Sequence, residues 1–234
     1  MRRVFLAGAF VLSFPALASA GPLCTTSSLQ SYINLGAGGC SIGAATLFDF
    51  SSDPSLFLGA TEIDAAEIVV TPTAILTGVQ LDFGLSASAG AGEIVGVLIG
   101  YSVTSPSFNI ATLAMSGSDA TSDGVVTAVQ DLCLGGTFIT DPTTCTGTLQ
   151  SQIVLEDELG PIGPSTLTPL SSFFDVFVDI TIDGGTFGSA ELDGTVSNQY
   201  GVVPEPTSVL LIGSGLLGMA ARSIRRRRER CTVD

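Results

Sequence analysis

The feature that most constrains the fold is an alternation of large apolar residues with small or polar ones at a period of two. In the segment 94–103 every second position is large and apolar, and the segment 174–183 repeats the pattern. Within the segment 75–85, Ile75, Val79, Leu81, Phe83 and Leu85 follow the same alternation. Such alternation is typical of β-strands that bury one face. Further strands are expected at residues 46–51, 63–71, 108–115, 125–132, 148–155 and 190–197.

Turn-forming residues separate these segments. They occur at Asp123-Gly124, Asp141-Pro142, Asp183-Gly184-Gly185 and Asp193-Gly194. Only residues 27–35 have the pattern of a short helix. Eight or nine strands separated by Gly, Ser and Asp predict an all-β fold, a single β-sandwich or jelly-roll-like domain.

The charged residues are distributed very unevenly. The chain has no Lys or His, and its eight Arg are confined to positions 2, 3, 222, 225–228 and 230. Three of the 22 Asp and Glu residues, namely Glu205, Glu229 and Asp234, lie outside residues 21–203, which leaves 19 in that body with no cationic side chain. Because phosphate binding depends on Lys and Arg, nucleic acid is excluded as a partner. Self-repulsion should also make stability sensitive to ionic strength and to divalent cations.

Four of the five cysteines lie close to a neighbour in sequence. Cys24 is near Cys40, and Cys133 is near Cys145. Four cysteines allow three connectivities, and we favour the two local pairs as disulfides because the chain has export signals. A zinc site would need thiolates at closer spacing, and the sequence has no His to add. We therefore expect no metal site built on cysteine.

The two ends of the chain read as targeting segments. Arg2 and Arg3, an apolar run over residues 4–17 and then Ala18-Ser19-Ala20 predict a signal peptide (residues 1–20) that is cleaved before Gly21. At the other end, residues 207–221 carry no charge and are followed by an arginine cluster. A helix of that length reaches about 22 Å, so it would span a bilayer only with thinning or snorkelling. The cluster, Arg222, Arg225, Arg226, Arg227, Arg228 and Arg230, predicts a stop-transfer signal on the cytoplasmic side.

Directly before the apolar run stands the motif Pro204, Glu205 and Pro206. Proline fixes φ and restricts the preceding residue, so this segment is expected to be extended and accessible to a peptidase. The motif, apolar segment and arginines together resemble the PEP-CTERM sorting signal. The resemblance implies an exported protein of an exopolysaccharide-producing Gram-negative bacterium, with an exosortase-type membrane peptidase as partner. A permanent membrane anchor is the alternative. The expected organisation is a signal peptide (1–20), a secreted domain (21–203) and a sorting signal (204–234).

The amino-acid composition excludes most kinds of catalytic site. Without His or Lys, neither a Ser-His-Asp nor a Ser-Lys arrangement can form. Carboxylate pairs are the one acid-base apparatus left, which keeps a glycoside hydrolase open. Its candidates are Asp175 or Asp179 with Glu156, Asp157 or Glu158. We expect no catalytic residues and no enzymatic activity, and we read Asp175, Asp179 and Asp183 as a solvated strand face.

Calcium is the one cofactor that the sequence leaves open. Carboxylates cluster in apparent loops at Asp119 to Asp123-Gly124, at Glu156-Asp157-Glu158 and at Glu191 to Asp193-Gly194. Calcium prefers such oxygen ligands, although none of these segments matches an EF-hand loop. The default expectation is therefore that no cofactor is bound and that these carboxylates keep the surface soluble.

Together these features predict a secreted, acidic, disulfide-bonded β-sandwich. It would be held briefly in the inner membrane and then processed toward the cell surface or extracellular matrix. Its body is expected to be a structural component of an exopolysaccharide matrix or biofilm. A carbohydrate- or calcium-dependent adhesion module is the second reading, and a two-carboxylate glycoside hydrolase is the third.

Overall fold

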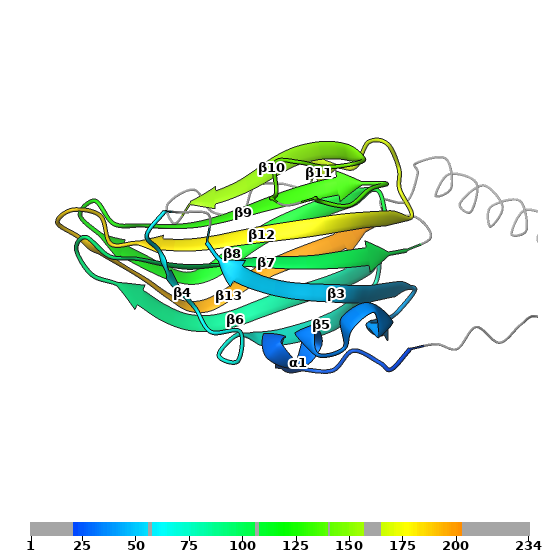
Figure 1. Ribbon diagram of the computed structural model, residues 1–234, viewed down its shortest axis with the longest axis horizontal. Coiled ribbons are helices and arrows are strands. Elements are labelled where there is room, and N and C mark those ends of the chain that lie inside the picture. Colours follow the sequence, from blue (N-terminus) through cyan, green and yellow to red (C-terminus); the bar gives the residue numbers. More distant parts are fainter. Residues whose placement is uncertain (1–20, 56–57, 106–107, 140, 157–164, 203–234) are drawn as a thin grey trace, which may run out of the picture.

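The computed structural model describes residues 21–55, 58–105, 108–139, 141–156 and 165–202. Two β-sheets lie face to face (Figure 1). The six-stranded sheet has the order β1 (Ser27–Ser28), β5 (Val69–Ile75), β6 (Gly78–Ala89), β13 (Ser189–Gly201), β8 (Ile110–Thr121) and β11 (Ser165–Thr166). The seven-stranded sheet has the order β10 (Thr148–Glu156), β9 (Val125–Leu134), β12 (Phe173–Asp183), β7 (Ile94–Thr104), β3 (Ala45–Pro54) and β2 (Cys40–Ile42), and β4 (Thr61–Glu62) also pairs with β7.

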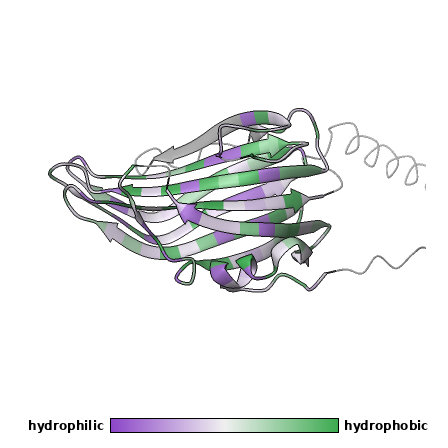
Figure 2. Ribbon diagram, in the orientation of Figure 1, coloured by the Kyte–Doolittle hydropathy of each residue, from purple (hydrophilic) through white to green (hydrophobic). Residues whose placement is uncertain are grey.

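The strand periodicity explains why the two sheets pack together. Along β12, Phe174, Val176 and Val178 are buried, while Asp175 and Phe177 on the other face are half-buried. The alternation is visible along several strands in Figure 2. Since successive side chains of a strand point to opposite faces, each sheet presents one apolar face to the other. The predicted all-β class is confirmed, and the two packed sheets are consistent with a β-sandwich.

Aromatic side chains from both sheets fill the centre of the core. Tyr101 of β7 packs against Phe50 and Phe83, with ring centroids 5.3 Å and 5.9 Å away. Tyr200 of β13 packs against Phe174 of β12 at 5.2 Å. Each such pair adds about 0.5–1.5 kcal/mol beyond the burial of apolar area, so these rings join the two sheets.

Four buried polar side chains form what we call the inner polar cluster: Tyr101, Gln130, Asn198 and Tyr200. The two tyrosine hydroxyls are 2.6 Å apart. Gln130 Nε2 donates to Asn198 Oδ1 at 2.6 Å and to the Tyr200 hydroxyl at 2.9 Å. Burial raises the pKa of both tyrosines above its usual range, so the cluster is neutral at physiological pH. These hydrogen bonds offset part of the cost of removing polar groups from water, while Gln130 Oε1 and Asn198 Nδ2 are buried without a hydrogen-bond partner among the described residues.

The short helix predicted over residues 27–35 is present as α1 (Leu29–Ile33), followed by the 3-10 turn η1 (Gly36–Gly38). The Ser28 hydroxyl accepts a hydrogen bond from Ser31 N–H and caps the helix. The buried residues Leu29 and Tyr32 attach α1 to the core.

Two sequence predictions about the strands are wrong. Residues 63–68 are not strand: β4 ends at Glu62 and β5 begins at Val69. Between them the Asp64 side chain accepts a hydrogen bond from Ala66 N–H, and the Asp64 carbonyl accepts one from Glu67 N–H. This local turn competes with strand pairing and lies where the chain passes from one sheet to the other.

The predicted turn at Asp193-Gly194 is a β-bulge inside β13. The pairing with β8 shifts register between Leu192 and Thr195. A Cβ atom on Gly194 would lie 2.0 Å from the Ser116 carbonyl oxygen. The glycine therefore permits a close approach of two strands and does not reverse the chain. The predicted turns at Asp123-Gly124 and Asp183-Gly184-Gly185 do connect β8 to β9 and β12 to β13.

Candidate functional site

A pocket of about 180 Å³ lies on the outer face of the seven-stranded sheet, and we call it the Asp49–Asp175 pocket. Its side chains come from three adjacent strands and from the loop after β9. Carboxylates, hydroxyls and aromatic rings meet there. The lining residues with chemistry to offer are Asp49, Ser51, Ser102, Thr137, Phe138, Asp175 and Phe177.

Strand register brings the floor of this pocket together. Asp175 of β12 is the cross-strand partner of Ser102 in β7, and Phe177 is the partner of Gly100. Gly100 is in turn paired with Ser51 of β3. A Cβ atom on Gly100 would lie 2.4 Å from Ser51 Oγ and 2.7 Å from the Phe177 ring. The glycine therefore keeps the floor open, because a larger residue would fill it.

Asp49 enters the pocket through an irregularity in β3. The pairing of β3 with β7 shifts register between Phe48 and Ser51. Asp49 has φ of 52°, a left-handed conformation that aspartate and asparagine tolerate better than most residues. The bulge leaves the Asp49 side chain exposed at the pocket.

Asp175 is the better anchored of the two carboxylates. Its Oδ1 accepts a hydrogen bond from the Ser102 hydroxyl, and its Oδ2 accepts one from Phe138 N–H at 3.3 Å. Burial raises the pKa of Asp175, and repulsion from the Asp49 carboxylate adds to this, while the two hydrogen bonds lower it. Asp175 is thus an oriented carboxylate whose charge is not compensated.

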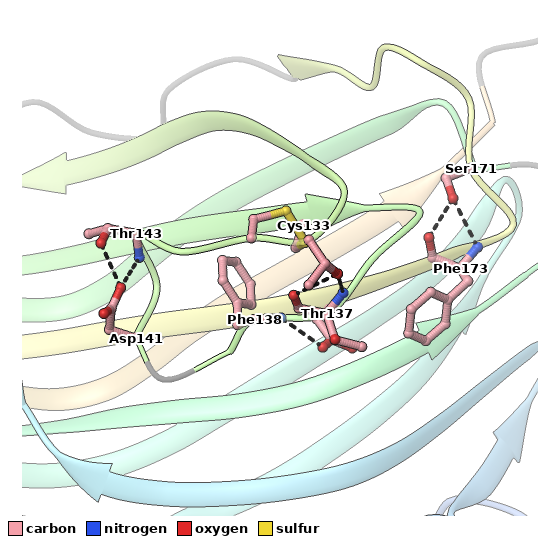
Figure 3. The surroundings of a disulfide bond; sticks show 10 residues. Cys133, Thr137, Phe138, Asp141, Thr143, Ser171 and Phe173 are labelled. Atoms are coloured by element: carbon pink, nitrogen blue, oxygen red, sulfur yellow. Dashed lines mark hydrogen bonds between the residues drawn. A yellow bond between two sulfur atoms is a disulfide. The ribbon is translucent and has the colours of Figure 1, made fainter.

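The loop after β9 forms one wall of the pocket. The Cys133–Cys145 disulfide closes it, and the chains on either side of it pair through Thr146 N–H, which donates to the Thr137 carbonyl at 3.0 Å. Figure 3 shows Phe138 beside this disulfide, above the strands. The Phe138 ring lies 4.7 Å from the Phe177 ring, centroid to centroid. Disulfide, loop and β12 together therefore provide the aromatic side of the pocket.

A second, larger pocket of about 510 Å³ adjoins the first, since Ser51 lines both. It lies between α1, β3 and the segment around β4. Its lining residues are Gln30, Ile33, Phe50, Ser51, Ser52, Glu62, Asp64 and Ala65. Like the first pocket, it combines carboxylates, hydroxyls and an aromatic residue.

Both cysteine pairs favoured from sequence are present. The Sγ atoms of Cys24 and Cys40 are 2.11 Å apart, and those of Cys133 and Cys145 are 2.00 Å apart. Pro204, Glu205, Pro206 and the arginine cluster lie outside the described residues.

Of the acidic partners considered for a hydrolase, the structure places only the backbone of Glu156. Glu156 is paired with Thr127, which is paired with Thr181, so it belongs to a strand two positions from β12. Asp157 and Glu158 lie outside the described residues. The carboxylate that shares a pocket with Asp175 is Asp49, which sequence reasoning missed. Its one signal is an acidic residue between Phe48 and Phe50 that interrupts the alternation.

The Asp row of β12 is less solvated than expected. Asp175, Asp179 and Asp183 are all half-buried. Asp179 accepts a hydrogen bond from the Ser55 hydroxyl at 2.9 Å, and Asp183 accepts one from Gly185 N–H at 2.8 Å. This strand face is therefore only partly solvated, because the segments after β3, β9 and β12 supply donors to these carboxylates.

The carboxylates considered for calcium lie mostly on strands. Asp119 of β8 and Glu191 of β13 are cross-strand partners, and Asp193 belongs to the bulge. Asp123 does lie in a turn, where hydrogen bonds from Phe187 and Thr186 N–H lower the pKa of its carboxyl. In the described parts of the chain no group of three or more His, Cys, Asp or Glu side chains could hold a metal ion.

The last described strand, β13, ends just before the predicted sorting segment. β13 is paired on both sides, with β6 and β8, and ends at Gly201. Val202 N–H then donates to the Thr77 carbonyl at 2.8 Å. The first described residues and the end of β13 lie toward the same end of the molecule, the right-hand end in Figure 1. No helix within the described ranges is long and apolar enough to cross a membrane, and the predicted segment 207–221 lies outside those ranges.

Comparison with known proteins gives one match. No curated protein and no solved structure is similar to the chain. The PEP-CTERM protein-sorting motif matches residues 202–227, which include Pro204, Glu205 and Pro206. Directly after the last strand of the described residues, this chain therefore carries the signal of an exosortase substrate.

Proposed function

We propose that this protein is a structural component of the cell surface or extracellular matrix of an exopolysaccharide-producing Gram-negative bacterium. A signal peptide exports it, the tail holds it briefly in the inner membrane, and an exosortase-type peptidase then removes the tail. The body acts outside the cell.

The observation that carries this proposal is the position of the sorting motif. The motif begins at residue 202, one residue after the end of β13. Removal of the tail within the motif would leave every described strand in place. Two disulfides further suit the body to an oxidising compartment.

The test is the C-terminal mass of the protein recovered from the cell surface or medium, in strains with and without the peptidase. We expect a chain that ends near residues 204–207 only when the peptidase is present. Glu205→Gln should reduce this processing, whereas the matched change Glu229→Gln, outside the matched segment, should not. Arginines that remain attached in both strains would show a permanent anchor instead.

The Asp49–Asp175 pocket supports a second candidate, a saccharide-binding adhesion module. Sugar sites combine apolar surface with a few oriented polar groups, and this pocket offers Phe138 and Phe177 together with carboxylates and hydroxyls. At about 180 Å³ it is smaller than the pockets of about 300–1,000 Å³ that hold drug-sized ligands. We therefore propose that it holds one sugar residue.

The two carboxylates also resemble the carboxylate pair of a glycoside hydrolase. We propose binding without catalysis. The test is incubation with soluble oligosaccharides of several compositions. New reducing ends that disappear in Asp175→Asn would contradict the proposal.

A further inference from the structure

The Asp49–Asp175 pocket has an unbalanced charge. Two carboxylates line it, and residues 4–221 contain no Lys, Arg or His that could neutralise them. We infer that this pocket binds a sugar residue that carries a protonated amino group, as in an amine-bearing matrix polysaccharide. The inference rests on the second candidate function and names its ligand.

Electrostatics selects the class of sugar. Two like charges that share a site disfavour each other's ionisation, and Asp49 contributes in this way to the raised pKa of Asp175. An anionic sugar would add a third negative charge. A neutral sugar would leave the repulsion in place, whereas an ammonium group relieves it and donates charge-assisted hydrogen bonds.

The remaining lining fits the rest of such a residue. The hydroxyls of Ser51, Ser102 and Thr137 can pair with sugar hydroxyls. The half-buried rings of Phe138 and Phe177 offer apolar surface to the C–H face of the sugar and can attract a nearby ammonium group. Asp49 is exposed and can approach the amine directly, while Asp175 is fixed by Ser102 and Phe138.

Calcium fits this pocket less well than an amine does. Calcium takes six to eight oxygen ligands, usually including several carboxylates. The pocket supplies two carboxylates, and one of them already accepts two hydrogen bonds from the protein. An ammonium group needs only a few acceptors, so it matches the donors and acceptors that are present.

The test compares glucosamine with N-acetylglucosamine, in which acetylation removes the charge of the amine. The processed protein recovered from cells is titrated with glucosamine and with N-acetylglucosamine at about pH 6, where the free amine is protonated, and binding is followed by NMR shifts or calorimetry. We expect glucosamine to bind at millimolar concentration and N-acetylglucosamine to bind at least about tenfold more weakly. Monosaccharides are used because a polycation would bind any acidic surface.

The variant Asp49→Asn removes the accessible charge while keeping a residue that tolerates a positive φ. It should weaken glucosamine binding about tenfold, the effect of roughly one charged hydrogen bond. The control Asp53→Asn makes the same change at an exposed residue of β3 that does not line the pocket, and it should have no effect.

Four results would overturn the inference. They are equal binding of the acetylated sugar, equal weakening by Asp53→Asn, binding that appears only when calcium is added, and absence of any binding. None of these results affects the C-terminal mass experiment, so a failure here and a failure of the sorting proposal are distinguishable.

Discussion

The inner polar cluster and the Asp49–Asp175 pocket lie on opposite faces of the seven-stranded sheet. Tyr101 points into the core, and its neighbour Ser102 points into the pocket. In the same way, Phe174 points into the core and Asp175 points into the pocket. The inner groups are almost completely buried, neutral and hydrogen-bonded to one another. The pocket carboxylates Asp49 and Asp175 are instead partly or fully exposed and carry charge.

This difference follows from the charge inventory. A buried carboxylate is costly unless a cation or several hydrogen bonds compensate it, and the body has no cation to offer. Polar groups between the sheets are therefore Tyr, Gln and Asn, which pair without charge. On the outer face Asp49 is exposed and Asp175 is half-buried, so these two carboxylates remain near water and can meet a ligand. The inner cluster stabilises the fold, and the outer pocket is available for binding.

Removal of the Tyr200 ring should give the largest effect on the inner side. Tyr200→Ala deletes a ring that contacts Phe174, Phe108 and Tyr101, and we expect a loss of about 4 kcal/mol in the free energy of unfolding. Tyr200→Phe keeps the ring and should cost about 1–2 kcal/mol. Urea denaturation measures both. Equal losses would mean that the hydroxyl, and not the ring, carries the interaction.

Removal of each disulfide in turn should distinguish an effect on stability from an effect on binding. Each double replacement, Cys133→Ser with Cys145→Ser or Cys24→Ser with Cys40→Ser, should lower the free energy of unfolding by about 3 kcal/mol. Only the first should also abolish glucosamine binding, because its loop places Phe138 against Phe177 and Asp175. Unfolding and titration of both variants test this. Loss of binding in both would show that the pocket depends on global stability.

Salt should change the stability of the protein through its carboxylates, whereas the contribution of the inner polar cluster should not depend on salt. Raising NaCl from about 0.01 M to about 1 M shortens the Debye length from about 30 Å to about 3 Å. Screening of the 19 carboxylates should raise the Tm of the wild type by a few degrees. The cost of Tyr200→Phe should stay constant across this range. Thermal melts measure both quantities, and a salt-independent Tm would contradict the role given to self-repulsion.

Replacement of Asp175 should give the smallest effect, a change in how stability depends on pH. Burial raises the pKa of Asp175, so the folded protein holds this proton more tightly than the unfolded chain, whose Asp pKa is about 3.9. The resulting stability is present below that value and is lost as the pH rises through the raised pKa. Asp175→Asn should therefore gain stability relative to the wild type over that window. A difference that is flat from pH 3 to pH 7 would contradict this.

The local features of the chain were predictable. Period-two alternation placed most of the strands because it depends on neighbouring residues alone. Turn residues identified the loops after Asp123 and Asp183, and the cysteine spacing favoured the two disulfides that form. The sorting motif is a contiguous segment, so it can be read without any fold. Each of these signals is contained in one short stretch of the chain.

The candidate site was not predictable in the same way. Asp49 and Asp175 are far apart in sequence, and they share a pocket only because β3 and β12 both pair with β7 in one particular register. The bulge that turns Asp49 toward the pocket, and the loop that lays Phe138 over Phe177, depend on contacts between distant segments. The sequence by itself determined the strands, the charge balance and the destination of this protein. Strand order and register decided which carboxylates meet, because pairing is a long-range interaction that alternation alone does not specify.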